Sequence, residues 1–212
     1  MPDPGTLGLF ALAALALLVI PGPAVLYVVT RSASQGRRAG LVSVLGLHTG
    51  SIVHVAAAAT GLSALLLTSA TAFEAVKLAG AAYLVWLGAV RLLGRSEAGE
   101  RATAPPAPMK RVYGQGVVVA ILNPKTALFF VAFLPQFIDP GRGPAVAQIL
   151  VLGLCFILLG LLSDSMYAVL AGMLAPRLRG RRLDRGLGPR LSGAVYVALG
   201  VLAALAHRPE PA

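Results

Sequence analysis

The sequence predicts an all-α integral membrane protein with six transmembrane helices, arranged as two inverted three-helix repeats whose first and fourth helices are broken. Three observations lead to this prediction. The 212 residues are 57% apolar and only 12% charged, with a mean hydropathy of +0.81, values that soluble domains of this length rarely reach. Six apolar stretches have about the 20 residues needed to cross a bilayer. Proline interrupts two of these stretches near their middle.

The candidate spans follow one another with short connections. They cover residues 6–30, 39–69, 73–93, 112–138, 144–175 and 189–206. No basic segment precedes the first apolar run, so we expect a first span there and not a cleaved signal peptide. The longest connection contains Ala104-Pro105-Pro106-Ala107-Pro108, which is typical of a loop. The chain therefore divides into a first three-helix repeat (1–93), a Pro-rich cytoplasmic linker loop (94–111), a second repeat (112–206) and a short tail (207–212).

Basic residues indicate the orientation in the membrane. Most of the 18 lysines and arginines follow spans one, three and five, at Arg31, Arg37, Arg38, Arg91, Arg95, Arg101, Lys110, Arg111, Arg177, Arg179, Arg181, Arg182, Arg185 and Arg190. The opposite loops and the tail contain only Arg142 and Arg208. Because loops rich in lysine and arginine stay in the cytoplasm, we expect both termini outside. A net charge of +10 in such loops does not indicate nucleic-acid binding.

An internal similarity supports the repeat. The stretch Lys77–Tyr83 (KLAGAAY) in span three resembles Arg190–Tyr196 (RLSGAVY) in span six. Three spans per half is an odd number, so the two halves must lie in opposite orientations, as in many secondary transporters. Chance similarity between helices rich in alanine and glycine is the alternative interpretation.

The two proline breaks fall in corresponding spans. Pro21-Gly22-Pro23 interrupts the first span, and Asn123-Pro124 interrupts the fourth. Proline removes a backbone donor and displaces the preceding turn, so carbonyl groups lose their intrahelical partners there. Irregular backbone at membrane depth is tolerated where protein buries it or where it lines a watery cavity. We therefore expect the two breaks to form a central substrate site.

Charged residues within the spans are the candidates for substrate contact. Lys125 lies about 20 Å from either end of its span, at 1.5 Å per residue, so its side chain cannot reach the headgroups. Lys125 and Asp164 should face the protein interior and have partners, because an unpaired charge at the bilayer centre costs about 2.5–3.5 kcal/mol. Tyr167 follows Asp164 on the same face of span five. A buried ion pair that only fixes packing is the alternative to a role in transport.

Two histidines lie in span two. Gly46, Gly50 and His54 are four residues apart, so the imidazole continues a small-residue seam against a neighbouring helix. A proton relay and a hydrogen bond across that interface are both open for His54. His48 is off this face and is interpreted as structural. The proton-coupling candidates are Asp164 and His54.

Several of these motifs resemble the LysE/RhtB family of bacterial amino-acid exporters. The similarity covers most of residues 15 to 200 and is carried by Pro21-Gly22-Pro23, Arg31-Ser32, Gly36–Leu41, Gly46, Gly50, His54, Gly61, Lys77–Leu84, Leu87-Gly88, Asn123-Pro124-Lys125, Leu134–Phe137, Asp164 and Tyr167-Ala168. The resemblance implies six membrane helices, a bacterial inner-membrane location, export of amino acids or close derivatives, and a homo-oligomer. One position departs from the pattern: many members have Asn or Asp after Pro-Gly-Pro, and this chain has Ala24.

The functional prediction is a secondary exporter, with Pro21, Gly22, Pro23, Asn123, Pro124, Lys125, Asp164 and Tyr167 at the substrate. A small-solute or ion channel with a central polar pore is the alternative, since a broken helix can also line a pore. No hydrolase or zinc-protease motif occurs, and three histidines with one cysteine give no plausible metal site, so we expect neither an enzyme nor a cofactor. Without a nucleotide-binding motif the driving force is a gradient, most simply of protons.

Overall fold

The computed structural model describes residues 1–62 and 106–178, together with positions 78, 82, 85, 86, 89, 197 and 201. Within these residues the chain is helical and has no β-strand. The elements are α1 (Pro4–Val19), α2 (Pro23–Gln35), α3 (Arg37–Ala57) with its π-helical extension η1 (Ala58–Leu62), α6 (Met109–Ile121), α7 (Pro124–Leu128), η2 (Phe129–Phe133), η3 (Leu134–Phe137), η4 (Pro140–Arg142) and α8 (Ala145–Leu178).

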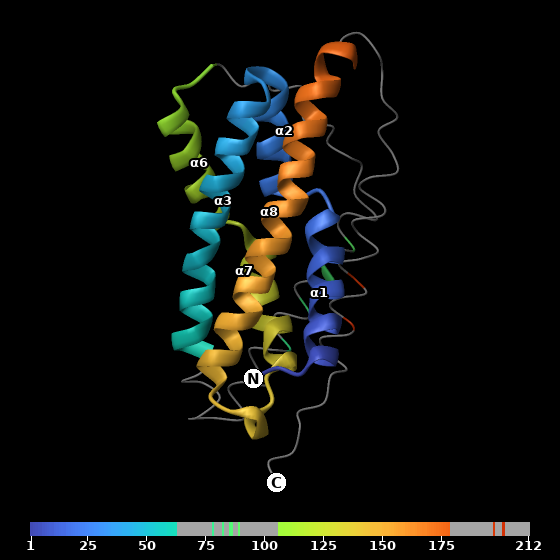
Figure 1. Ribbon diagram of the computed structural model, residues 1–212, viewed down its shortest axis with the longest axis vertical. Coiled ribbons are helices and arrows are strands. Elements are labelled where there is room, and N and C mark those ends of the chain that lie inside the picture. The colour runs from blue at the N-terminus through green and yellow to red at the C-terminus, as the bar shows by residue number, and fades with distance from the viewer. Residues whose placement is uncertain are drawn as a thin grey trace.

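The helices form an elongated bundle in which α8 runs from one end to the other (Figure 1). Helices α1 and α7 occupy one end of this bundle, and α2 and α6 occupy the other end (Figure 1). The axes of α1 and α2 meet at 54°, and those of α6 and the segment Lys125–Phe137 meet at 44°. Both breaks therefore lie near the middle of the long axis.

The two broken segments run in opposite directions. Phe10, early in α1, packs against Phe137 at the end of η3, with ring centroids 5.3 Å apart. Gln35, the last residue of α2, donates a 2.9 Å hydrogen bond from Nε2 to the carbonyl of Ala107, two residues before α6 begins. The start of one broken segment thus meets the end of the other, which is the relation that an inverted repeat requires of these two spans.

Glycines let α3 and α6 approach closely. A Cβ atom on Gly46 would lie 2.2 Å from the carbonyl oxygen of Tyr113, and one on Gly50 would lie 2.5 Å from that of Val117. His54 continues the same line, as its position four residues after Gly50 predicts. Close backbone contact at small residues is how membrane helices gain packing energy.

A cluster of phenylalanine rings fills the end of the bundle formed by α1, η2, η3 and α8. Its rings are in contact at centroid distances from 5.1 to 6.1 Å and belong to Phe10, Phe129, Phe130, Phe133, Phe137 and Phe156. Four of these side chains, at positions 10, 129, 130 and 156, are almost completely buried. The cluster makes this end of the bundle dry and apolar.

The structure confirms an all-helical protein and both predicted breaks. Arg37–Gly61 and Ala145–Ala175 are each long and apolar enough to cross a membrane, and each bent pair would add one span, so the described residues contain two to four candidate spans. The predicted spans 73–93 and 189–206 and the tail 207–212 lie outside the described residues, except for the isolated positions, as do the linker as far as residue 105 and the Lys77–Tyr83 similarity. Six spans and the complete inverted repeat remain predictions.

Candidate functional site

The first break follows from the Pro-Gly-Pro sequence. Helix α1 ends at Val19, and Ile20 has an extended backbone with φ −75° and ψ 125°. Gly22 is also extended, and Pro23 is the first residue of α2. Proline suits that position because its fixed φ matches the helix and the amide it lacks would have no intrahelical partner.

The second break is stabilised by its own side chains. Asn123 has an extended backbone, and its side-chain oxygen accepts a 3.1 Å hydrogen bond from the amide of Lys125. The side-chain nitrogen of Asn123 donates to the hydroxyl of Thr126 at 3.0 Å. Pro124 again is the first residue of the next helix. Asn123 therefore acts as an N-cap, with both of its polar atoms used inside the second break.

At each break a carbonyl accepts a hydrogen bond from a side chain of another helix, and the Ala120 carbonyl also accepts one from the amide of Asn123 at 3.0 Å. In a continuous helix the amides of residues 23 and 124 would bond to the carbonyls of Val19 and Ala120, but both residues are proline. The hydroxyl of Tyr167 donates to the Val19 carbonyl at 2.6 Å, and Nε2 of His54 lies 2.9 Å from the Ala120 carbonyl. A carbonyl only accepts, so His54 must donate through Nε2. Tyr167 from α8 and His54 from α3 thus perform matching tasks at the two breaks.

Lys125 links the second break to the first. Its Nζ donates a 2.7 Å hydrogen bond to the carbonyl of Ile20, just beyond the end of α1. Lys125 is buried, with 6% of its surface exposed. The carbonyl end of a helix, here that of α1, favours a cation. A hydrogen bond to a charged group contributes about 1.5–3 kcal/mol. This hydrogen bond offsets part of the free energy that burying the lysine charge costs.

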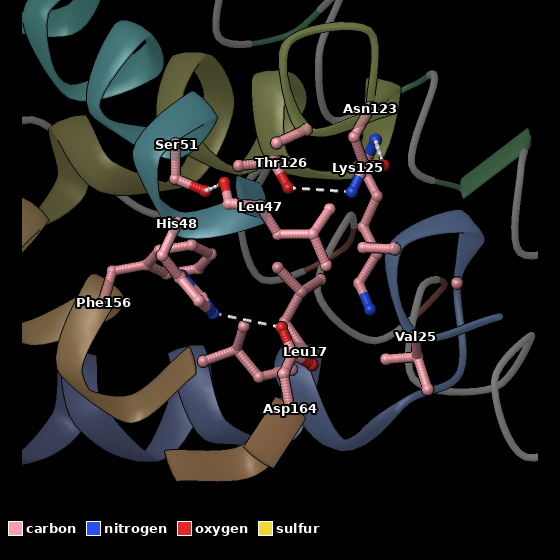
Figure 2. Close-up of a pocket in the computed structure, with 14 residues that line it drawn as sticks. Leu17, Val25, Leu47, His48, Ser51, Asn123, Lys125, Thr126, Phe156 and Asp164 are labelled. Atoms are coloured by element: carbon pink, nitrogen blue, oxygen red, sulfur yellow. Dashed lines mark hydrogen bonds and ion pairs between the residues drawn. The ribbon is translucent and has the colours of Figure 1, made fainter. Parts of the chain in front are cut away.

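A cavity of about 30 Å³ lies where the two breaks meet. Its lining comes from α1, α2, α3, α6, α7, α8 and both breaks, and consists of Leu17, Leu18, Gly22, Ala24, Val25, Leu47, His48, Ser51, Ala120, Asn123, Lys125, Thr126, Phe156 and Asp164 (Figure 2). One water needs about 10–15 Å³ of such volume, so the cavity has room for about two waters and not for an amino acid. A larger ligand would require the surrounding helices to separate.

Asp164 is bound to a histidine at this cavity. Nε2 of His48 lies 3.1 Å from Oδ2 of Asp164, and the two side chains are 6% and 5% exposed. Figure 2 shows the pair on the side of the cavity opposite Asn123 and the start of α7. The other ring nitrogen of His48, Nδ1, is buried and has no hydrogen-bond partner among the described residues. Gly160 creates the space for the ring, since a Cβ there would lie 2.3 Å from Cε1 of His48.

A second polar cluster lies between the cavity and the basic end of the bundle. The guanidinium of Arg31 donates to the side-chain oxygens of Gln35 at 3.0 Å and Gln115 at 2.7 Å, and it lies 5.6 Å from the centre of the Tyr27 ring. These contacts join α2 to α6. Arg31 is buried and its partners are half-buried, in contrast to the apolar end filled by phenylalanine rings.

The structure brings most of the predicted site residues together. Gly22, Asn123, Lys125 and Asp164 line the cavity, whereas Tyr167 and His54 hold the carbonyls at the two breaks. The interface hydrogen bond foreseen as one alternative for His54 is present. The structural interpretation of His48 is incomplete, because His48 lines the cavity and binds Asp164. Sequence reasoning missed this contact, although the facing positions of Gly160 and His48 on two apolar helices could have suggested it.

Comparison with known proteins decides the family. The sequence profile of the LysE type translocators matches residues 15–207. This chain belongs to the LysE type translocator family. It is 32% identical over 191 residues to a homoserine/homoserine lactone efflux protein of Salmonella typhimurium, which covers 90% of this chain and 92% of that protein.

Other relatives of this translocator agree. An uncharacterized membrane protein of Vibrio cholerae is 31% identical over 197 residues, covering 93% of this chain and 95% of the relative. A leucine efflux protein of Salmonella choleraesuis is 30% identical over 131 residues, covering 61% and 62% of the two chains. No solved structure matches the chain. The translocator is therefore a multi-pass membrane protein of a transporter family, as the sequence predicts, and not an enzyme.

Proposed function

We propose that this translocator exports a neutral amino acid, or a close derivative of one, across the bacterial inner membrane in exchange for protons. The observation that carries the proposal is the cavity between the two breaks, which has a lysine on one side and a carboxylate on the other. An amino acid is a zwitterion with the matching pair of charges. Pro21, Gly22, Pro23, Asn123, Pro124, Lys125, Asp164 and Tyr167 make up the proposed site.

The charged residues that line the cavity indicate where the carboxylate and the ammonium of the substrate bind. Lys125 binds the carboxylate, helped by the start of α2, where Ala24 and Val25 line the cavity and a helix N-terminus favours an anion. Asp164 receives the α-ammonium. Among the described lining residues only Lys125, Asp164 and His48 carry or can gain a charge, so a charged substrate side chain would have no counter-ion. This favours a neutral amino acid over a basic or acidic one.

The remaining lining indicates an aliphatic side chain. Leu17, Leu18, Val25, Leu47 and Phe156 contribute apolar surface, and Ala24 contributes a methyl group where many family members have Asn or Asp. An apolar pocket with few polar groups binds an apolar side chain and orients it by its charged end. Leucine is accordingly the first substrate to test, and one relative is a leucine efflux protein. Homoserine is the second, because another relative is a homoserine/homoserine lactone efflux protein.

Substrate binding opens the link between the breaks. The carboxylate of the substrate is a stronger partner for Nζ of Lys125 than the neutral carbonyl of Ile20. When Lys125 turns to the substrate, the contact that ties α7 to α1 is lost, and the small cavity can widen. This gives alternating access a defined trigger at the point where both broken spans change direction.

Proton exchange is proposed at the carboxylate of Asp164 or at a group bonded to it, and less directly at His54. Asp164 lines the cavity, where a proton and a substrate can reach the same carboxylate. His54 already donates to the Ala120 carbonyl at the second break, which gives it a structural task. The geometry therefore favours Asp164 of the two candidates.

The proposed orientation puts both termini on the outer side. Arg31, Arg37, Arg38, Lys110 and Arg111 lie at the end of the bundle where α2, α3 and α6 meet, and Met1 and Arg142 lie at the other end (Figure 1). A clustered basic end favours the cytoplasm. Association with further copies of the chain, implied by the family resemblance, belongs to the same proposal.

Counterflow in proteoliposomes tests this function. Vesicles are loaded with each of the twenty amino acids or with homoserine, and entry of labelled leucine is followed. A carrier shows saturable entry that the correct internal substrate accelerates, and an imposed proton gradient drives accumulation. Entry that neither saturates nor responds to internal substrate would support the channel alternative. No entry for any compound would overturn the proposed function.

A further inference from the structure

We infer that His48 and the ammonium of the substrate compete for the carboxylate of Asp164, so that His48 is the residue that exchanges a proton for each exported molecule. The inference rests on the proposed function and assigns its proton step to a residue outside the resemblance and outside the predicted site. It follows from the contacts of His48, its burial and the charges around it.

The first step is the position of the imidazole. His48 lines the cavity and bonds through Nε2 to Oδ2 of Asp164 at 3.1 Å. An ammonium that binds the same oxygen must occupy the space that Nε2 now holds. Gly160 lets the ring lie directly against α8, since a Cβ there would lie 2.3 Å from Cε1 of the imidazole.

The second step is the charge around the ring. Asp164 from α8 bonds to the ring and Lys125 from α7 lines the same cavity, while the cavity lining from α1, α2 and α6 contains no titratable residue in the part of the chain that the structure describes. Asp164 is therefore the counter-ion for a proton on His48, and Lys125 is a second cation on the lining. When a substrate ammonium neutralises Asp164, a protonated His48 would be left beside two cations in a buried site. It must then release its proton.

The third step is the exit of that proton. Nδ1 of His48 is buried, and no group among the described residues accepts a hydrogen bond from it. The cavity has room for about two waters, which can carry a proton away. On the cytoplasmic side, the substrate binds and one proton leaves His48. On the outer side, the substrate leaves and one proton returns to His48, so that protons and substrate move in opposite directions.

Proton release on binding provides the test. Purified wild-type protein in weakly buffered detergent solution is titrated with leucine and separately with homoserine over about pH 5 to 8, the range in which histidine titrates. We expect about one proton released per bound molecule at the acidic side of the titration, because binding and protonation are linked reciprocally. His48→Gln retains a donor for Asp164 and has no proton to exchange, so it should bind substrate and release none.

A neighbouring residue provides the matched control. Thr49, on the same helix, faces away from the cavity and bonds to Tyr113, so Thr49→Ala should release protons as the wild type does. In proteoliposomes, His48→Gln should lose gradient-driven accumulation by about tenfold or more relative to its own rate of counterflow. If His48→Gln does not reach the membrane, the smaller His48→Asn replaces it in both assays.

The outcomes separate the two proposals. Wild-type protein that binds substrate without releasing protons overturns the role of His48, and so does a His48 variant that releases protons or accumulates substrate like the wild type. Both results leave amino-acid export itself intact, since counterflow tests it separately. Wild-type protein that neither binds nor exchanges any amino acid overturns the exporter, and the role of His48 with it.

Discussion

The ammonium of Lys125 lies 2.7 Å from the carbonyl oxygen of Ile20, so the two breaks of the protein contact one another directly. The two residues are 105 positions apart in the chain and belong to the two broken segments. One end of this contact is a charge that needs a partner, and the other is a carbonyl freed by the end of α1. The ammonium and the carbonyl are hydrogen-bonded to each other. When a substrate arrives and Lys125 turns to it, this hydrogen bond is broken.

Removing the charge tests this link. Lys125→Met keeps the length of the side chain and leaves the Ile20 carbonyl without its donor, so we expect unfolding in detergent to become easier by about 1.5–3 kcal/mol. Counterflow of leucine should fall by about tenfold or more, since the substrate carboxylate loses its cation. Lys110→Met is the control, because Lys110 is exposed at the basic end of α6. Equal losses in the two variants would argue against a special role for Lys125.

The second break can be tested with Pro124→Ala. The substitution restores an amide that can bond to the carbonyl of Ala120, which allows α6 to continue into α7 with less bend. We expect normal abundance in the membrane and a fall in leucine export of about tenfold or more. Pro4→Ala is the control, because Pro4 begins α1 at an exposed position far from the cavity. Normal export by Pro124→Ala would remove the unwound segment from the site.

His54 offers a test that distinguishes donation from titration. His54→Gln can still donate to the Ala120 carbonyl and cannot gain a proton, whereas His54→Leu can do neither. The structure leads us to expect gradient-driven export by His54→Gln and a loss of about 1–3 kcal/mol in stability for His54→Leu. If His54→Gln lost the proton-driven step while retaining counterflow, His54 would carry the proton.

Local chemistry explains why the breaks were predictable. Proline acts within four residues of itself, so Pro23 and Pro124 show where the helices end without knowledge of the neighbours. Spacing also predicted the seam of α3, since Gly46, Gly50 and His54 fall on one face by helical geometry alone. The interior position of Lys125 followed from the cost of charge in a membrane.

The contacts of the charged groups were less predictable. His48 lies six residues before His54, which turns it to a different side of α3, and which helix it meets there depends on how α8 is rotated. Sequence reasoning expected Lys125 and Asp164 to have buried partners and left a buried ion pair as one alternative. The structure adds two groups to this arrangement, His48 at Asp164 and the Ile20 carbonyl at Lys125. The proline pattern predicts free carbonyls near residue 20, but it does not indicate which side chain from another helix meets one of them.

Reporter fusions test the orientation. Gln35 lies at the basic end of the bundle and Gly141 at the opposite end, in η4 (Figure 1). A phosphatase fused after Gly141 should be active, because it would be outside, and one fused after Gln35 should be inactive. A cytoplasmic reporter at the same two positions should give the reverse pattern. If Gly141 reported the cytoplasm and Gln35 the outer side, the protein would be inverted relative to the proposal.

Two glycines of α8 separate packing from the contact between His48 and Asp164. A Cβ at Gly153 would lie 2.6 Å from a methyl group of Val55, and one at Gly160 would lie 2.3 Å from Cε1 of His48. Both alanine variants push side chains of α3 aside, so we expect a similar loss of stability, of about 1–3 kcal/mol. Only Gly160→Ala displaces the imidazole from the carboxylate.

Transport by these two variants should therefore differ although their stability does not. In proteoliposomes with an imposed proton gradient, Gly153→Ala should accumulate leucine at close to the wild-type level when corrected for the amount of protein. Gly160→Ala should show accumulation reduced by about fivefold or more. Coupling between two binding sites, here those of the proton and the substrate, typically changes affinity by at least that factor. Equal accumulation by the two variants would indicate that the close fit of His48 against α8 serves packing alone.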